Sequence, residues 1–162
     1  FHHLYNTDVI NLRFFTVYGP GQRPDLAIHK FVKNIANDKP VVLFGDGSTA
    51  RDYTYIDDTV SGIFNALQFC LKNTGLYTTV NLGNNKPVKL KDLVDAIYTG
   101  MGKTKNIVYD AMQPGDVEIT FADITKARDL FGYKPATDLA TGIGKFIDWF
   151  ITVEKEKKVN ME

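Results

Sequence analysis

The sequence predicts a mixed α/β fold, with two strands of a parallel sheet joined to a smaller set of strands and helices. The first observation is a pair of apolar runs at residues 8–15 and 78–82, which are typical of parallel strands covered on both faces. The second is their alternation with amphipathic segments, of which residues 90–101 are the clearest. The third is that no repeat or low-complexity linker interrupts the chain. We therefore expect a single region over residues 1–162, with a charged tail at residues 154–162 that frays.

The first third of the chain begins with five residues that resemble the last turns of a helix, because no cap precedes them and a strand follows at once. A loop at Gly19-Pro20-Gly21 follows this strand. Asp25 is a good N-cap for the next helix, and His29 is expected on its solvent face. The apolar side of this helix carries Leu26, Ala27, Phe31, Val32 and Ile35.

The stretch from Gly45 to Asp58 organises the rest of the chain. Its two glycines follow the apolar run at residues 41–44, where a strand ends and the backbone turns. Residues 51–56 then alternate aromatic and polar side chains as a short strand does. Asp57 or Asp58 can cap the next helix, whose apolar residues are Val60, Ile63, Phe64, Leu67 and Leu71.

Arg51 lies between the glycine turn and the junction of this strand with its helix. A guanidinium group fixed in this way suits a bidentate contact with a phosphate or a carboxylate. The alternative is a surface turn in which Arg51 pairs with Asp46 or Asp52. The residues of this stretch leave both interpretations open.

The remaining elements are short apart from the helix at residues 90–101, which ends at Gly100 and Gly102. Beyond it we expect a strand at residues 107–109, a turn at residues 113–116, a further strand at residues 118–121, a helix from Thr125 to Gly132 and a last helix from Leu139.

Composition excludes several classes of function. Lysine and arginine balance aspartate and glutamate at nineteen each, which argues against a nucleic-acid partner or a polybasic membrane surface. Cys70 is the one cysteine, so no internal disulfide forms and a reducing, cytoplasmic location is favoured. No apolar run approaches the length of a membrane span. The histidines and the cysteine do not have zinc spacing, and Gly19-Pro20-Gly21 is not a phosphate fingerprint.

Polar residues gather at the ends of the predicted elements. In open α/β sheets such residues collect in one cleft, which makes them candidates for a binding site. Each also has a local interpretation, as a strand end, a solvated charge or ordinary turn chemistry. The candidates are Thr16, Arg23, Arg51, Asn81, Gln113 and Asp116.

Four motifs resemble the nucleotide-sugar epimerases and dehydratases of the extended short-chain dehydrogenase/reductase superfamily. They run from Leu12 to Asp25, from Gly45 to Asp58, from Met112 to Asp123 and from Gly132 to Trp149. The resemblance covers nearly the whole chain in the family's order. The sequence of residues 14–20 and 112–116 is most similar to that of the UDP-glucuronate 4-epimerases.

The resemblance implies that this chain is the C-terminal, substrate-binding part of a Rossmann-like enzyme whose NAD-binding half precedes Phe1. The glycine fingerprint and the catalytic Tyr-x-x-x-Lys pair of the family are not in the chain, so no catalytic residue is expected here and the isolated chain is expected to be inactive. The whole enzyme is expected to bind NAD and a UDP-sugar and to form a homodimer.

The resemblance also assigns roles to individual residues. Arg51 and Arg23 would bind the nucleotide diphosphate or the sugar, Thr16 would contact the sugar carboxylate, and Asp116 would support the ribose. Gln113 stands where relatives have arginine, which implies a weaker phosphate contact. The cofactor-binding residues would be Phe15 and Val17, beside the nicotinamide, and the base pocket would be lined by Ala27, Phe31, Val42, Leu43 and Phe44.

The family's reaction would oxidise C4 of the sugar by hydride transfer to NAD, turn over the 4-keto intermediate and return the hydride. Two alternatives stay open at this point. One is part of a sugar-nucleotide 4,6-dehydratase or decarboxylase, which shares the arginine contacts. The other is a free-standing nucleotide-sugar binding module, although an apolar strand such as residues 9–15 would then expose an edge.

Overall fold

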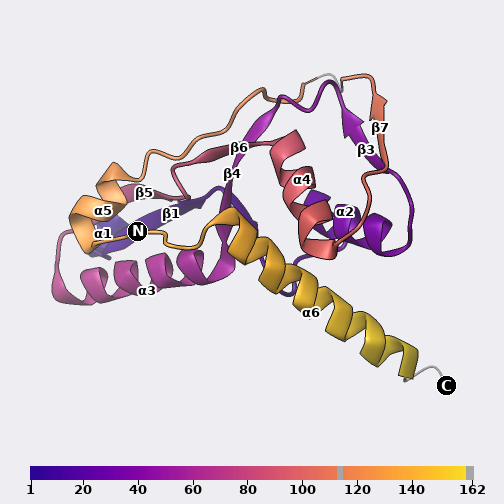
Figure 1. Ribbon diagram of the computed structural model, residues 1–162. Coiled ribbons are helices and arrows are strands. Elements are labelled where there is room, and N and C mark those ends of the chain that lie inside the picture. The colour runs from indigo at the N-terminus through magenta and orange to yellow at the C-terminus, as the bar shows by residue number, and fades with distance from the viewer. Residues whose placement is uncertain (113–114, 160–162) are drawn as a thin grey trace. The chain divides into compact units, whose positions relative to one another are not determined.

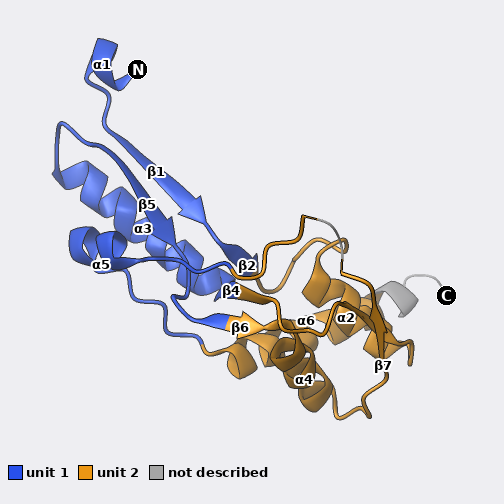
Figure 2. Ribbon diagram, turned by 90° about the horizontal axis from the view of Figure 1, so that it is seen from above, with its two compact units in different colours: residues 1–17, 52–87, 120–137 blue, residues 18–51, 88–119, 138–162 orange. Residues whose placement is uncertain are grey.

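The structure of the protein is a computed structural model that describes residues 1–112 and 115–159 (Figure 1). The mixed α/β class predicted from the sequence is confirmed. The chain forms two compact units within the single region expected from the sequence (Figure 2). Unit 1 comprises Phe1–Val17, Asp52–Pro87 and Thr120–Thr137, and unit 2 comprises Tyr18–Arg51, Val88–Ile119 and Asp138–Glu162.

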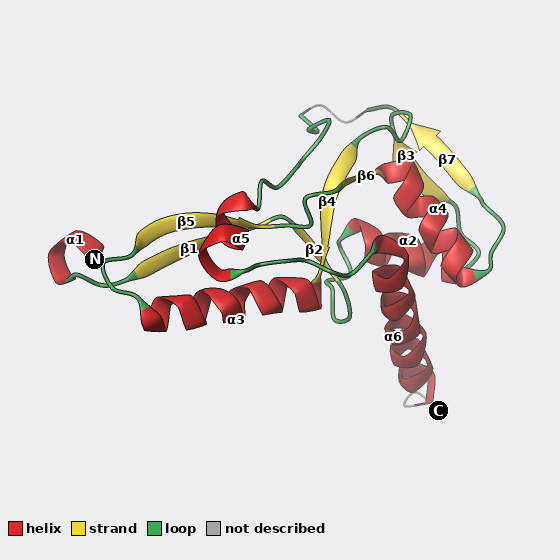
Figure 3. Ribbon diagram, turned by 60° about the vertical axis from the view of Figure 1, so that its left-hand side comes forward, coloured by secondary structure: helices red, strands yellow, loops and turns green. Residues whose placement is uncertain are grey.

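Unit 1 is built on a parallel pair of strands, β1 (Val9–Phe14) and β5 (Tyr77–Leu82), whose register runs from Val9 opposite Tyr77 to Phe14 opposite Leu82. The helix α1 (His2–Tyr5) precedes β1. The helices α3 (Ile56–Lys72) and α5 (Thr125–Phe131) lie against the two strands (Figure 3). The core residues between these elements are Val80, Leu82, Ala127 and Tyr133.

The expectation that residues 8–15 are covered on both faces is wrong for β1. Phe14 is 51% exposed, and Asn11 and Arg13 are also exposed. Among the described residues, β1 is hydrogen-bonded as a strand only to β5. β1 therefore carries more apolar surface than unit 1 buries.

The start and the buried side of α3 also differ from expectation. The helix follows Tyr55 without a side-chain cap, and Asp58 instead accepts hydrogen bonds from the backbone N–H groups of Ala136 and Thr137 at 3.0 Å each. The buried residues are Asp58, Thr59, Gly62 and Ala66. Small side chains are buried because α3 lies very close to its neighbours: a Cβ at Gly62 would be 2.8 Å from the Tyr133 ring. The predicted apolar face, by contrast, lies exposed.

The helices of unit 2 among the described residues are α2 (Ala27–Ala36), α4 (Leu90–Met101) and α6 (Leu139–Val159). α4 packs against both α2 and α6. The predicted bounds of α4 are confirmed, and Gly102 ends it in the left-handed conformation. α6 continues to Val159, beyond Glu154, where fraying was expected to begin. The fully buried core residues include Val32, Val41, Leu43, Leu93, Val94, Ile97 and Phe146.

The predictions for α2 need two corrections. Asp25 is not the cap: α2 follows Leu26 and has no side-chain cap bond, while Asp25 pairs with Arg23. His29 was expected on the solvent face but is 8% exposed. Its ring lies among the aromatic side chains of α6. His29 is therefore buried in an apolar environment, although the apolar pattern of the helix did not predict this.

Two further strands of unit 2, β3 (Val41–Phe44) and β7 (Ile107–Asp110), pair in parallel with Val41 opposite Ile107. Both strands were predicted from the sequence. The expected strand at residues 118–121 is wrong, since only an isolated bridge between Ile119 and Ala50 forms there.

The chain passes from one unit to the other within three strands that pair in the order β2 (Thr16–Tyr18), β4 (Ala50–Tyr55), β6 (Pro87–Lys89). The strand predicted from the alternation at residues 51–56 is confirmed as β4, and its polar residues Asp52 and Thr54 are both 0% exposed. β6 was not predicted. No helix within the described ranges is long and apolar enough to cross a membrane.

Candidate anion-binding site

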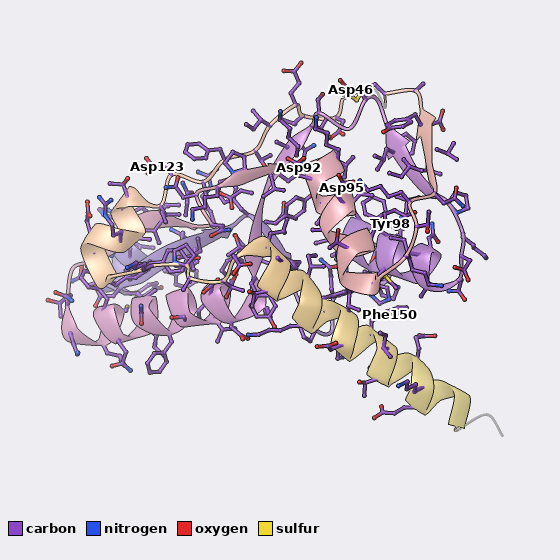
Figure 4. The ribbon with its side chains drawn as sticks, viewed as in Figure 1. Asp46, Asp92, Asp95, Tyr98, Asp123 and Phe150 are labelled. Atoms are coloured by element: carbon purple, nitrogen blue, oxygen red, sulfur yellow. The ribbon has the colours of Figure 1, made fainter. Side chains whose placement is uncertain are left out.

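The centre of the candidate site in unit 2 is the glycine turn that follows β3. Gly45 and Gly47 have φ values of 68° and 74°, in the left-handed region that glycine adopts without strain. Between them, Asp46 accepts a hydrogen bond from the Ser48 N–H at 2.9 Å (Asp46 is labelled in Figure 4). The hydrogen bonds from Ser48 lower the pKa of Asp46, so this carboxylate stays charged and closes its own turn.

Arg51 is held just beyond this turn. Its Nη1 donates to the Ala50 carbonyl at 2.9 Å, and its Nη2 forms an ion pair with Asp116. The Arg51 side chain is 23% exposed and that of Asp116 is 39% exposed. The interpretation in which Arg51 pairs with Asp46 or Asp52 is therefore wrong, because a carboxylate from far along the chain occupies the guanidinium.

The segment that carries Asp116 runs beside the turn. On the N-terminal side of Asp116, the Asp110 carbonyl accepts a hydrogen bond from the Gly45 N–H at 2.9 Å. On its C-terminal side, the Glu118 carbonyl accepts one from the Ala50 N–H at 2.8 Å. The Arg51–Asp116 pair is thus fixed by backbone bonds on both sides. Gln113, the other candidate of this segment, lies outside the described residues.

The residues proposed for a base pocket differ in exposure. Ala27 is exposed and Val42 is 39% exposed, so both offer apolar surface to a ligand. Phe44 is half-buried. Phe31 and Leu43 are 9% and 0% exposed, which makes their side chains part of the core of unit 2 that supports this surface from behind.

Arg23 belongs to the loop before α2, where its Nη2 lies 3.2 Å from an Asp25 carboxylate oxygen. Their side chains are 73% and 63% exposed. Exposed pairs of this kind contribute about 0–1 kcal/mol, so the Arg23 guanidinium is available to an incoming anion. Among the described residues, Arg23 pairs with Asp25 and not with the residues around Arg51.

Unit 1 holds the candidates assigned to the sugar and the cofactor. Phe15, Thr16 and Val17 are consecutive and half-buried, and the Phe15 N–H donates to the Leu82 carbonyl at 3.1 Å. Asn81 donates from Nδ2 to the carbonyl of Asp123, 42 residues away, at 3.0 Å, so this side chain forms a tertiary hydrogen bond.

Sequence reasoning missed the buried carboxylate of Asp52. It accepts three backbone N–H groups: Asn84 at 2.6 Å, Asn85 at 3.0 Å and Ala122 at 2.9 Å. A buried charge is tolerated only with such partners. The available signal was an aspartate directly after Arg51, on a strand that also carries Tyr53 and Tyr55.

Within residues 1–112 and 115–159, no group of three or more histidine, cysteine, aspartate or glutamate side chains is arranged to hold a metal ion. The candidate site offers two arginines, the carboxylate of Asp116 that pairs with Arg51, and the exposed apolar surface of Ala27 and Val42. Guanidinium groups beside glycine turns bind phosphates and carboxylates.

Comparison with known proteins identifies the family. The sequence pattern of the NAD dependent epimerase/dehydratase family matches residues 1–83. UDP-glucuronate 4-epimerase 1 of Arabidopsis thaliana is 41% identical over 165 residues, which are 94% of this chain and 38% of that protein. UDP-glucuronate 4-epimerase of Thermodesulfobacterium geofontis is 39% identical over 150 residues, which are 92% of this chain and 45% of that protein.

Solved structures agree. The crystal structure of UDP-glucuronic acid 4-epimerase from Bacillus cereus, in complex with UDP-glucuronic acid and NAD, matches with a TM-score of 0.86 at 35% identity, over 94% of this chain and 48% of that one. The chain thus spans about half the length of its relatives or less. The family resemblance predicted from the motifs is confirmed: the chain belongs to the NAD dependent epimerase/dehydratase family.

Proposed function

We propose that this chain is the nucleotide-sugar binding part of a UDP-sugar 4-epimerase, with UDP-glucuronate as the substrate. The observation that carries the proposal is the Arg51 guanidinium, which is mostly buried, held by the Ala50 carbonyl and paired with Asp116. The relatives named UDP-glucuronate 4-epimerase support the choice of sugar.

Arg51 would bind the diphosphate by replacing a carboxylate with a phosphate. In the structure Asp116 occupies one side of the guanidinium, and a phosphate group presents the same planar pair of acceptor oxygens. The Asp116 carboxylate would then accept a hydrogen bond from a ribose hydroxyl. Arg23 would approach the diphosphate or the sugar from its exposed loop.

The remaining candidate residues would contact the sugar and the base of the substrate. The Thr16 hydroxyl would donate to the sugar carboxylate, and Ala27 and Val42 would contact the uracil ring. NAD, when bound to the whole enzyme, supplies the hydride chemistry at C4 of the sugar. Phe15 and Val17 would present apolar surface beside the nicotinamide. The work of this chain is to bind and orient the substrate.

The activity, the homodimer and the cytoplasmic location belong to the same proposal and concern a protein longer than this chain. A 4,6-dehydratase or decarboxylase of nucleotide sugars shares the arginine contacts and is the second candidate. The exposed apolar residues of β1 and α3 argue against a free-standing binding module, because unit 1 leaves them uncovered.

The test is isothermal titration calorimetry of the chain with UDP and UDP-glucuronate. Replacing Arg51 by alanine removes charge-assisted hydrogen bonds worth about 1.5–3 kcal/mol, so UDP is expected to bind roughly ten- to hundredfold more weakly. Arg128→Ala is the matched control, since Arg128 forms an exposed pair with Asp129 on α5, and it should leave the affinity unchanged. A folded chain that binds neither nucleotide contradicts the proposal.

A further inference from the structure

We propose that His29 is a positioning residue for Arg23, so that the affinity of the nucleotide-sugar site depends on a buried imidazole that does not touch the ligand. The inference rests on the proposed function, in which Arg23 contacts the substrate. It starts from one hydrogen bond: His29 Nδ1 lies 2.9 Å from the carbonyl oxygen of Gln22, the residue directly before Arg23. A carbonyl only accepts, so Nδ1 carries the proton in this bond.

The ring of His29 is held from the other side by α6. Phe146, Trp149 and Phe150 surround it with ring centroids at 5.8, 5.9 and 5.5 Å and interplanar angles of 75°, 81° and 88°. These edge-to-face contacts are the favoured geometry for aromatic pairs. We call the three residues the aromatic sleeve (Phe150 is labelled in Figure 4). The sleeve fixes the plane of the imidazole, and His29 is 8% exposed within it.

The hydrogen bond from His29 connects the loop at residues 19–26 to α2. The Gln22 N–H donates to the Gly19 carbonyl at 3.1 Å, and the Leu26 N–H donates to the Arg23 carbonyl at 3.2 Å. Both bonds join loop residues to one another, whereas the bond from His29 joins the loop to a helix in the core of unit 2. The exposed Arg23–Asp25 pair adds little. His29 therefore transmits the rigidity of α2 and α6 to the backbone that carries Arg23.

Two variants separate the hydrogen bond from the packing. His29→Phe keeps an aromatic ring within the sleeve and removes the donor. His29→Asn removes the ring but keeps an N–H donor close to the position of Nδ1. If His29 acts by holding the loop, the Phe variant should bind UDP-glucuronate roughly three- to tenfold more weakly than the parent chain, and the Asn variant should recover most of the loss.

A double-mutant cycle tests whether the effect passes through Arg23. In an Arg23→Ala background, His29→Phe should have no further effect on the affinity for UDP-glucuronate, because the group that it positions is gone. Hydrogen exchange of the amides at residues 19–26 should quicken in His29→Phe and stay near the parent rate in His29→Asn.

Each contrary result has its own meaning. Unchanged affinity in His29→Phe, an equal loss in both backgrounds, or an Arg23→Ala chain that binds normally would each overturn the positioning role. A parent chain that binds no UDP-glucuronate would overturn the proposed function. Hydrogen exchange would then test the role of His29 by itself: unchanged exchange at residues 19–26 in His29→Phe would overturn that role as well.

Discussion

The helices α3 and α4 carry the same pattern of apolar residues and use it in opposite ways. In α3 of unit 1 the pattern occupies residues 60, 63, 64, 67 and 71, and in α4 of unit 2 it occupies residues 90, 93, 94, 97 and 101. Leu93, Val94 and Ile97 are 0% exposed, whereas the five residues of α3 are 40–73% exposed. An identical periodicity therefore indicates a helix but not which of its faces is buried.

The two units are stabilised by different means as a result. Unit 2 buries large side chains between its helices, as in an ordinary hydrophobic core. Unit 1 also has a small apolar core, but at α3 it packs the small residues Gly62 and Ala66, and it satisfies two buried carboxylates with backbone N–H groups. Those carboxylates are Asp52 and Asp58. Substitutions with the same chemistry should accordingly have different costs in the two units.

The largest expected difference concerns one substitution made in both helices. Leu93→Ala removes a fully buried side chain from unit 2, and such truncations lower the free energy of unfolding by about 2–5 kcal/mol. Leu67→Ala acts on a residue that is 51% exposed in α3, so its cost should stay within about 1 kcal/mol. Urea denaturation followed by circular dichroism measures both. Equal costs would mean that the exposed face of α3 is covered in solution.

Alanine substitutions of glycines should also distinguish the two units, with an effect on stability smaller than that of Leu93→Ala. A Cβ at Gly83 in unit 1 would be 2.2 Å from the Ala122 Cβ, whereas a Cβ at Gly144 in α6 would meet nothing within 4 Å. Gly83→Ala should therefore cost about 1–3 kcal/mol through overpacking. Gly144→Ala should stabilise the chain by roughly 0.5–1 kcal/mol, because alanine loses less conformational entropy in a helix.

Thermal unfolding of these two alanine variants shows directly whether each substitution raises or lowers the stability of the chain. The midpoint should fall for Gly83→Ala and rise for Gly144→Ala. A stable Gly83→Ala chain would show that β5 and the segment around Ala122 are less closely packed than the structure has them.

Local sequence patterns predicted most of the elements. The bounds of α4, the strand at residues 41–44 and the glycine turn after it depend on neighbouring residues alone, and all three are confirmed. Arg51 also follows that turn as predicted, as the second residue of β4. Its partner was not predicted, because Asp116 lies 65 residues away and two nearer aspartates offered the same charge.

Two of the features that sequence reasoning missed depend on tertiary contacts. His29 is buried because aromatic residues more than a hundred positions away surround it. Asp52 is buried because three backbone N–H groups from two distant segments converge on it. Periodicity could not reveal either contact, since it measures polarity along one helix or strand and not the groups that another segment supplies.

The smallest expected effect is one that the two units should share. Asp138 accepts hydrogen bonds from the N–H and hydroxyl of Thr141 at 2.9 and 2.8 Å at the start of α6. Asp123 (labelled in Figure 4) accepts from the Thr125 N–H at 2.9 Å before α5. In each case the backbone N–H is the main cause that lowers the pKa of the carboxyl group, and the threonine hydroxyl adds to it.

The direction of the pH dependence follows from these lowered values. Each carboxylate binds protons less readily in the folded chain than in the unfolded one, so its contribution is complete above the ordinary pKa of 3.8 and is lost as the pH falls through the lowered folded value. Asp138→Asn and Asp123→Asn should therefore each reduce the thermal midpoint at pH 7 by a small amount, and the difference from the parent chain should shrink towards pH 2. Since this device is the same in both units, the two shifts should be alike. A large shift for Asp138 alone would mean that the units differ in how their helices begin as well as in their cores.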